Sequence, residues 1–278
     1  MKISFSVIVV LYNVKLLEST SVKEVYRQAE VFNNNNIKIE VYVCDNSTRY
    51  MGNRSQANQL GIHYLDMGRN VGLAKAFNYA INVVSGSYIT IFDDDSILDG
   101  EYFNKMLKVI QSNPNTDIFL PEVFALGKKI SPSREVGCFV RQFPRCFGHI
   151  TGISSGMTIR RNVFKKIKYD EKMFLDFIDY DFIKASKNSG FKIIEVNNIK
   201  ISQKFSVFED DPKDSVNRFE IMLKDLLYFS KKYAYIRSGL LSIFLLAIKR
   251  TIRYRNKSFL RMSLQVIYGQ YSNLHRSR

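Results

Sequence analysis

Short apolar runs alternate with helical patterns through the first third of this 278-residue chain, and this alternation allows few architectures. Residues 4–11 form a continuous run of β-branched and apolar side chains, which is typical of a strand buried on both faces of a parallel sheet. Three more strand-like runs and two helical patterns follow, at residues 37–43, 62–65, 88–92, 21–32 and 73–84. This rhythm predicts an α/β fold with a doubly wound, mostly parallel sheet flanked by helices.

The start of the first helical pattern carries a local signal of its own. Ser21 is followed three residues later by Glu24, the spacing of a capping box. We therefore expect Ser21 to be the N-cap of this helix.

The second half of the chain is less regular and ends in a helical region. A further strand is expected at 191–196, and from about Pro212 onward the pattern is mostly helical. The sequence contains no internal repeat and no low-complexity linker. We predict an α/β domain over 1–210 and a basic helical extension over 211–278.

Cysteine usage and the start of the chain bear on the compartment. Cys44, Cys138 and Cys146 are odd in number and form no Cys-x-x-Cys pair, which argues against a disulfide framework or a zinc knuckle. The first strand-like run begins at Ile3 with no cleavable signal before it. These features predict a cytoplasmic protein.

Basic charge is concentrated in the helical extension. The chain carries a net charge of +15, and residues 231–278 contain 11 Lys and Arg and no Asp or Glu. The apolar run at 240–248 has about half the length that a membrane-spanning helix needs. Apolar and cationic stretches in alternation favour helices that lie on a membrane surface. A helical hairpin packed on the domain with a basic solvated face fits equally well.

Three consecutive aspartates follow the fourth strand-like run, and they are the strongest chemical signal in the sequence. Asp93 and Asp95, two positions apart, can direct two carboxylates to one point at the end of a strand. Hard oxygen ligands of this kind suit Mg²⁺ or Mn²⁺, which would also hold a diphosphate. The alternative is that these residues cap the next helix. Ligands in such sheets bind beyond the carboxyl ends of the strands, where Asp45 also lies.

A second acidic cluster lies among aromatic residues near the start of a later helix, at Asp176, Asp179 and Asp181. A carboxylate in an apolar setting has a raised proton affinity, which suits a general base. Helix capping is the alternative for Asp176 or Asp179, and a glycosidase-like carboxylate pair is a third possibility. A hydrolase would not need the aspartate pair at the strand end.

The glycine-flanked segment 68–72 precedes the second helical pattern. It could hold a phosphate group at the helix N-terminus. It lacks the spacing of the dinucleotide and P-loop motifs, so an ordinary turn is the alternative.

Taken in order, these motifs resemble the inverting family 2 glycosyltransferases of the GT-A fold, in particular the bacterial rhamnosyltransferase-like subgroup. The resemblance extends over about residues 4–205. The matching stretches are 7–13, 43–47, 70–78, 92–95, 155–161 and 177–181.

The resemblance implies a role for each matching residue. The domain over 1–210 would bind the nucleotide-sugar and carry out catalysis, with Asp179 as the base that deprotonates the acceptor hydroxyl. Asp93 and Asp95 would ligate Mn²⁺ or Mg²⁺. The donor-binding residues that it implies are Tyr12, Asp45 (on the base), Asn70, Asp93 (near the ribose) and Asp94.

This chain departs from the family pattern at two positions. Gln203 stands where relatives often have a histidine that helps the metal or the diphosphate. Ile178 precedes the presumed base where many relatives have glutamate, so Asp181 stays an alternative to Asp179.

The resemblance implies a metal-dependent hexosyltransferase with a UDP- or dTDP-sugar donor. The acceptor would be a saccharide, expected on a polyprenyl diphosphate, in the synthesis of a bacterial surface polysaccharide such as O-antigen or capsule. The enzyme would act peripherally at the inner face of the cell membrane through its basic region. A nucleic-acid-binding protein explains the charge but not the acidic strand ends. A nucleotidyltransferase should carry a glycine-rich basic loop after the first strand, where this chain has Tyr12, Asn13 and Val14.

Overall fold

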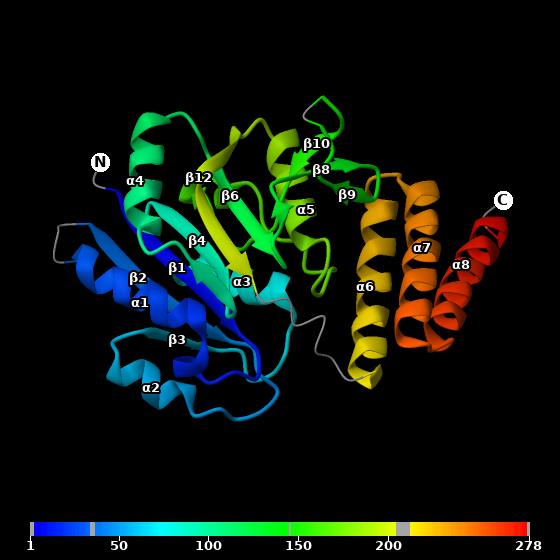
Figure 1. Ribbon diagram of the computed structural model, residues 1–278, viewed down its shortest axis with the longest axis horizontal. Helices are drawn as coiled ribbons and strands as arrows, with labels where there is room; N and C mark the ends of the chain where they lie inside the picture. Colours follow the sequence, from blue (N-terminus) through cyan, green and yellow to red (C-terminus); the bar gives the residue numbers. More distant parts are fainter. Residues whose placement is uncertain (1–2, 34–36, 145, 204–211, 277–278) are drawn as a thin grey trace.

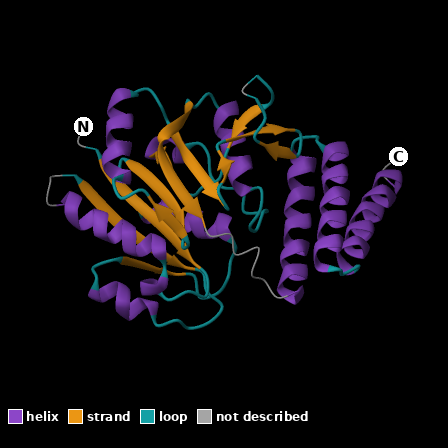
Figure 2. Ribbon diagram, in the orientation of Figure 1, coloured by secondary structure: helices purple, strands orange, loops and turns teal. Residues whose placement is uncertain are grey.

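A computed structural model describes residues 3–33, 37–144, 146–203 and 212–276 of the chain. A large twisted sheet forms the centre, helices cover both of its faces, and three C-terminal helices stand side by side at one end (Figures 1 and 2). The predicted boundary near residue 210 falls in the segment 204–211, which lies outside the described residues.

Within the described residues the main sheet has nine strands, in the order β3-β2-β1-β4-β11-β6-β12-β5 with β7 beside β6. Its strands are β1 (Ser4–Leu11), β2 (Lys38–Asp45), β3 (His63–Asp66), β4 (Tyr88–Asp93), β5 (Ser96–Leu98), β6 (Ile118–Ala125), β7 (Lys128–Ser131), β11 (Met157–Arg160) and β12 (Ile193–Gln203). A smaller sheet contains β8 (Ser133–Val136), β9 (Phe139–Arg141) and β10 (His149–Thr151). The helices are α1 (Thr20–Asn33), α2 (Asn53–Gln59), α3 (Leu73–Val83), α4 (Tyr102–Ser112), α5 (Ile178–Asn188), α6 (Pro212–Lys232), α7 (Ile236–Tyr254) and α8 (Ser258–Arg276).

The first four strands, β1 to β4, are parallel and in register, as the sequence predicts. β1 lies between β2 and β4, with Leu11 opposite Asp45 and Val10 opposite Asp93. Because these strands run in one direction, their carboxyl ends meet at one edge of the sheet. Both acidic strand ends therefore lie at the same edge.

The strands of the second half join the sheet in both directions. β11 is antiparallel to β4 and to β6, whereas β12 is parallel to β6. β12 ends against β5, where Gln203 pairs with Ser96. The end of the last strand is thus brought to the turn that follows β4.

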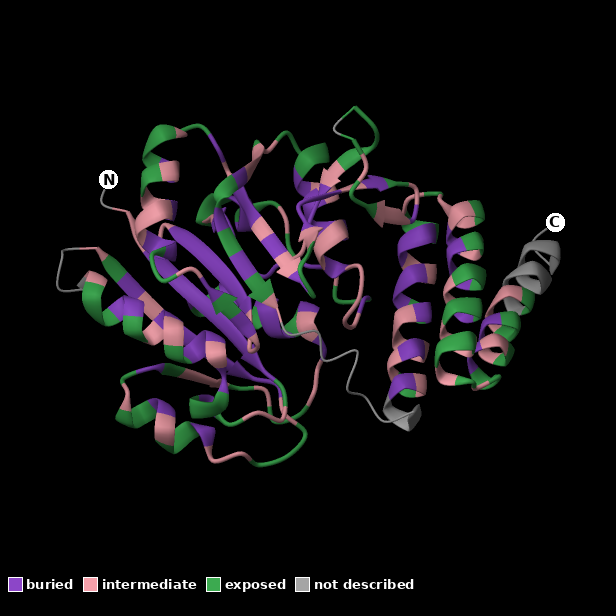
Figure 3. Cartoon of the chain, in the orientation of Figure 1, coloured by how far each residue is buried: buried purple, intermediate pink, exposed green. Residues whose placement is uncertain are grey.

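Alternate side chains of β1 enter two hydrophobic cores, which explains why its sequence is apolar without interruption. Phe5, Val7 and Val9 pack on one face with residues of α1 and α4. Ile8 and Val10 pack on the other face, in a core that includes residues of α3, α5, α6, α7 and α8. The C-terminal helices therefore share a core with the sheet, and their inner positions are buried (Figure 3).

The N-cap expected at Ser21 is wrong by two residues. α1 begins at Thr20, and the hydroxyl of Ser19 accepts the backbone N–H of Val22 at 3.1 Å, which is the contact of an N-cap. The hydroxyl of Ser21 instead donates to the carbonyl of Asp93. The residue that the local spacing assigns to capping thus forms a tertiary hydrogen bond instead.

None of the helices, over the residues that can be described, is both long and apolar enough to cross a membrane.

Candidate active site

Serines at the start of α1 form hydrogen bonds to the backbone of the acidic turn after β4. Ser19 donates its hydroxyl to the carbonyl of Asp94 at 2.7 Å, and Ser21 donates to the carbonyl of Asp93. The backbone N–H of Ser96 donates to the Ser21 hydroxyl at 2.9 Å. These bonds fix the backbone of the acidic turn to the start of α1.

Asp93 is half-buried among other acids, and an amide lies against its carboxylate. The side-chain N–H of Gln203 donates to its Oδ2. Burial, together with the charges of Asp95, Asp179 and Asp94, raises the pKa of Asp93 to about 8. A cation at this point would favour the charged carboxylate.

Asp93 and Asp95 would suit a Mg²⁺ or Mn²⁺ ion only together with a phosphate-bearing ligand. Mg²⁺ usually takes one or two carboxylates and completes its shell with water and substrate phosphates. In the part of the chain that is described, no three His, Cys, Asp or Glu residues are grouped as a metal site. Protein ligands would therefore be few, and the ion would depend on its ligand for the rest.

Tyr12 and Asp94 lie together where β1 ends. The backbone N–H of Tyr12 bonds the carboxylate of Asp94, while burial raises the pKa of that carboxyl. The Tyr12 side chain is 49% exposed. Asn13 follows with φ of 55° and accepts the N–H of Thr48 at 3.0 Å, which joins the ends of β1 and β2.

Asp45 is buried at the end of β2, and its carboxylate is fixed by three donors. Asn53 and the hydroxyl of Tyr64 donate to Oδ2 at 2.8 and 2.9 Å, and the N–H of Ser47 donates to Oδ1 at 3.1 Å. A carboxylate has about four acceptor positions. Among the residues that the structure describes, Asp45 thus has room for one more donor, on Oδ1.

Asn70 shapes the loop before α3. Its Oδ1 accepts the N–H of Gly72 at 3.0 Å and the side-chain N–H of Asn46 at 3.0 Å. Gly72 has φ of 87°, and a Cβ there would lie 2.7 Å from the carbonyl oxygen of Phe174. That same carbonyl accepts the N–H of Leu73 at 2.7 Å. One of the free N–H groups of the helix start is therefore used within the protein, which favours the turn over the phosphate cradle.

Asp179 lies in the first turn of α5 and is bound by Ser154 on both oxygens. The backbone N–H of Ser154 donates to Oδ2 at 3.1 Å, and its hydroxyl donates to Oδ1. Burial raises the pKa of Asp179 to about 6, with Asp176 adding to the rise and Ser154 opposing it. A carboxyl with this pKa can both accept and release a proton near neutral pH.

Hydrogen bonds connect this aspartate to the acidic turn. The hydroxyls of Ser155 and Ser96 lie 2.6 Å apart. Ser96 directly follows Asp95, and Ser155 directly follows the residue that binds Asp179. The two acidic motifs, more than 80 residues apart in sequence, therefore meet at one place.

The other two acids of the second cluster face the C-terminal helices. Asp181 is buried and accepts Lys232 at 2.6 Å and the hydroxyl of Tyr233 at 2.8 Å. Asp176 lies 3.5 Å from Arg218 of α6. Both are engaged in contacts that hold the helices to the domain.

Asp225 of α6 is a site-supporting residue that the sequence reading missed. It is buried, and it accepts the backbone N–H groups of Phe174, Leu175 and Asp176 at 2.8–2.9 Å. These residues lead into α5 and Asp179. The available signal is an acidic residue at helical spacing from Met222 and Phe229, on an otherwise apolar face.

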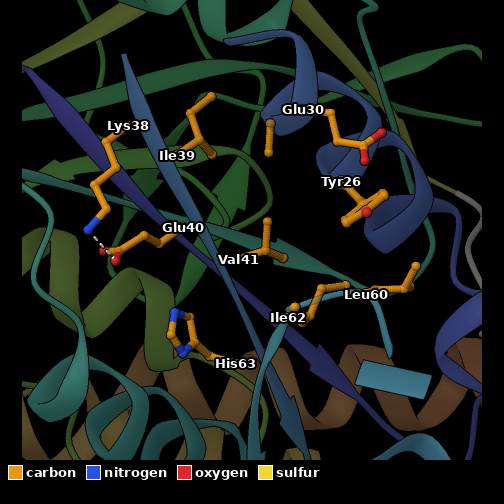
Figure 4. Close-up of a pocket in the computed structure, with 11 residues that line it drawn as sticks. Tyr26, Glu30, Lys38, Ile39, Glu40, Val41, Leu60, Ile62 and His63 are labelled. Atoms are coloured by element: carbon orange, nitrogen blue, oxygen red, sulfur yellow. Dashed lines mark ion pairs between the residues drawn. The ribbon is translucent and has the colours of Figure 1, made fainter. Parts of the chain in front are cut away.

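A cavity of about 360 Å³ lies away from these acids, at the opposite ends of the strands (Figure 4). Tyr26 and Glu30 of α1 line one side, and Leu60 and Ile62 line another. Its ion pair, between Lys38 and Glu40 at 2.7 Å, lies near the amino end of β2. A smaller cavity of about 320 Å³ lies beside Asn70 and is lined by Arg69, Val71, Lys75, Glu171, Lys172 and Phe174.

Comparison with known proteins gives consistent matches. The family model described as Glycosyl transferase family 2 matches residues 6–168. An uncharacterised glycosyltransferase of Methanocaldococcus jannaschii is 29% identical over 141 residues, which is 48% of each chain. A dTDP-rhamnosyl transferase of Shigella flexneri is 28% identical over 173 residues, which is 58% of each chain. This chain thus spans about half the length of these curated relatives.

Solved structures of S. aureus TarS share the fold. One has a TM-score of 0.53 and 17% identity, covering 82% of this chain and 40% of TarS. Another, of TarS 1–349 in complex with UDP, has a TM-score of 0.53 and 15% identity, covering 94% of this chain and 81% of that one. With the family match, these confirm the predicted GT-A fold with a helical C-terminal region.

Proposed function

This chain belongs to glycosyl transferase family 2, and we propose that it moves a hexose from a nucleoside diphosphate donor to a saccharide hydroxyl. The observation that carries the proposal is the bond between Ser96 and Ser155, because it brings the metal-suited pair Asp93 and Asp95 to the base candidate Asp179. A single displacement needs both at one centre: a group that stabilises the leaving diphosphate and a base on the attacking oxygen.

Asp179 accepts the proton of the acceptor hydroxyl as that oxygen forms its bond to the anomeric carbon. The bond from this carbon to the donor's phosphate oxygen breaks in the same step, and the nucleoside diphosphate leaves with its electron pair. The configuration at the anomeric carbon is thereby inverted. Ser154 holds both carboxylate oxygens of Asp179, which orients the base and keeps its charged form accessible near neutral pH.

Asp93 and Asp95 would hold Mg²⁺ or Mn²⁺, which supplies positive charge to the departing diphosphate. We assign the base role to Asp179 rather than Asp181, since Asp181 is already paired with Lys232 and Tyr233. Gln203 fixes the orientation of Asp93 from the neighbouring strand.

The donor is a UDP- or dTDP-sugar. Uracil and thymine share an imide N–H, and the open acceptor position on Oδ1 of Asp45 suits that donor group. The exposed ring of Tyr12, which directly follows the residue opposite Asp45 in the sheet, offers a stacking surface. Asn70 and Asp94 complete the donor site. The dTDP-rhamnosyl relative and the UDP complex of TarS support these two bases.

The acceptor is a saccharide on a polyprenyl diphosphate, in the synthesis of a bacterial surface polysaccharide such as O-antigen or capsule. An acceptor of this kind stays in the membrane, so the enzyme acts as a peripheral protein at the cytoplasmic face. The basic C-terminal region supports this location, because anionic lipids attract Lys and Arg.

Calorimetric titration of UDP and dTDP, with and without Mn²⁺, tests the donor site. We expect metal-dependent binding of one or both nucleotides, which is lost in Asp95→Ala. Asp117→Ala is the matched control, since Asp117 precedes β6 and bonds the N–H of Lys192 away from the acidic turn. If neither nucleotide binds with metal, or if Asp95→Ala binds as well as the parent protein, the proposal is overturned.

A further inference from the structure

α7 carries an unbroken apolar stripe on its outer face. Leu241, Phe244, Leu245, Ile248 and Ile252 follow the 3-4 spacing of one helical face, and they are 37–72% exposed. The opposite face of α7 is buried, with Ile243 and Ala247 in the core. Figure 3 shows exposed positions along the length of α7. The stripe is therefore not part of the packing that holds α7 to the protein.

The outer face of α8 combines apolar and basic side chains. Leu264 is 50% exposed and Tyr268 is 77% exposed. Exposed Arg261 lies three residues before Leu264. Exposed Lys257, directly before the helix, lies four residues before Arg261. α8 packs against α7, so the two outer faces belong to neighbouring helices.

We propose that the stripe of α7, with the outer face of α8, is a docking surface for an anionic lipid membrane. Interfacial helices combine exposed apolar side chains with basic residues and do not span the bilayer. Lys249 and Arg253 are exposed at the edge of the stripe, and residues 231–278 carry no acidic side chain. The proposal deepens the membrane part of the proposed function and rests on it for its purpose, whereas its test requires no sugar transfer.

Charge favours an anionic membrane over a second copy of the chain as the partner of this surface. Pairing two stripes would bring two sets of like charges together, which is unfavourable. An anionic lipid surface supplies the opposite charge, at about 1 kcal/mol for each Lys or Arg near the surface. Nucleic acid would match the basic residues but leave five apolar side chains in water.

The test is flotation of the full chain with vesicles of phosphatidylcholine, with and without about one third phosphatidylglycerol. We expect binding to the anionic vesicles, and a drop of about tenfold in Leu245→Gln with Ile252→Gln. Lys249→Gln with Arg261→Gln should lower binding by a similar factor. The control pair, Leu17→Gln with Val83→Gln, replaces side chains that are 49% and 48% exposed elsewhere, and it should bind like the parent.

Point substitutions are used because deletion of α7 and α8 would uncover Ile243 and Phe259 of the core. Unchanged flotation of the Leu245→Gln, Ile252→Gln variant would overturn the proposal. A second result would also overturn it: the parent protein does not bind vesicles but sediments as a dimer, and the variant sediments as a monomer. Nucleotide titration of the same variant separates the two proposals: retained binding with lost flotation supports both, and absent nucleotide binding with intact flotation removes only the proposed donor site.

Discussion

The hydroxyls of Ser96 and Ser155 lie 2.6 Å apart, and this contact joins the acidic turn after β4 to the segment that holds Asp179. Both serines are buried, so the bond is shielded from water and fixes the spacing between the two acidic motifs. Preorganised groups of this kind lower the barrier to reaction because they need not move when charge develops.

Replacement of Asp179 by asparagine should remove the base without removing the donor site. We expect kcat to fall by about 10²–10⁴, the usual contribution of general base catalysis. The affinity for the donor nucleotide should stay within about twofold, measured by calorimetry. Asp181→Asn is the comparison: it leaves Lys232 without its buried partner, so its main effect should be a lower melting temperature. If Asp181→Asn loses more kcat than Asp179→Asn while staying folded, the assignment of the base is reversed.

The pH profile should report the carboxyl of Asp179. Its pKa is about 6, so as the pH falls through 6 the carboxylate takes up a proton and can no longer accept one from the acceptor. Below pH 6 we expect kcat/KM to fall about tenfold for each unit by which the pH is lowered. Ser154→Ala removes a bond that lowers this pKa, so the acidic limb should move upward by about one pH unit. Ser85→Ala, which removes a hydroxyl from Glu40, should leave the profile in place.

Asp225→Asn should weaken both stability and activity. An amide offers one oxygen where the carboxylate accepts three N–H groups, so we expect the free energy of unfolding to drop by about 2–4 kcal/mol. The freed segment precedes α5, so kcat should fall as well. It is measured at donor concentrations above the KM. Glu220→Gln on the same helix removes an exposed ion pair with Lys224 and should change stability by less than about 1 kcal/mol. Equal stability of the two variants would show that the segment does not need its anchor.

Gly72→Ala should distort the loop that carries Asn70. A Cβ would meet the backbone oxygen of Phe174 at 2.7 Å and its ring at 2.8 Å, and φ is 87°. We expect a loss of about 2–4 kcal/mol in urea unfolding, together with weaker nucleotide binding. Gly68→Ala shares the positive φ but has open space around it, so it should cost only about 1–2 kcal/mol. A similar cost for both variants would point to backbone strain alone.

The sequence was informative wherever periodicity or chain direction decides the outcome. Residues 4–11 form a strand because apolar side chains on both faces have cores to enter. Asp45 and Asp93 lie at the same edge of the sheet because their strands are parallel to β1, which lies between them. The roles of these aspartates stay predictions. The family resemblance pointed to residues in sequence order but gave no contacts.

Contacts between polar side chains from distant segments could not be read in advance. The bond of Ser154 to Asp179 depends on how a loop packs, and that of Tyr64 to Asp45 depends on which strand pairs with β2. No periodic pattern marks either bond. Ser21 shows the same limit: its spacing matched a capping box, but a better partner lay in the turn after β4. Asp225 was hidden for another reason, because an acid on a helix is ordinarily a solvent-facing residue.

α6 has a consequence for how relatives of this protein can be recombined. Through Asp225 it fixes the segment before α5, through Lys232 it neutralises Asp181, and its apolar face completes the core beneath the sheet. A chimera that joins the first 210 residues to another enzyme's tail would therefore lose the anchor of residues 174–176 along with its own helices. The natural unit of exchange is the segment 174–181 and α6 together, so changes in one should be inherited with changes in the other.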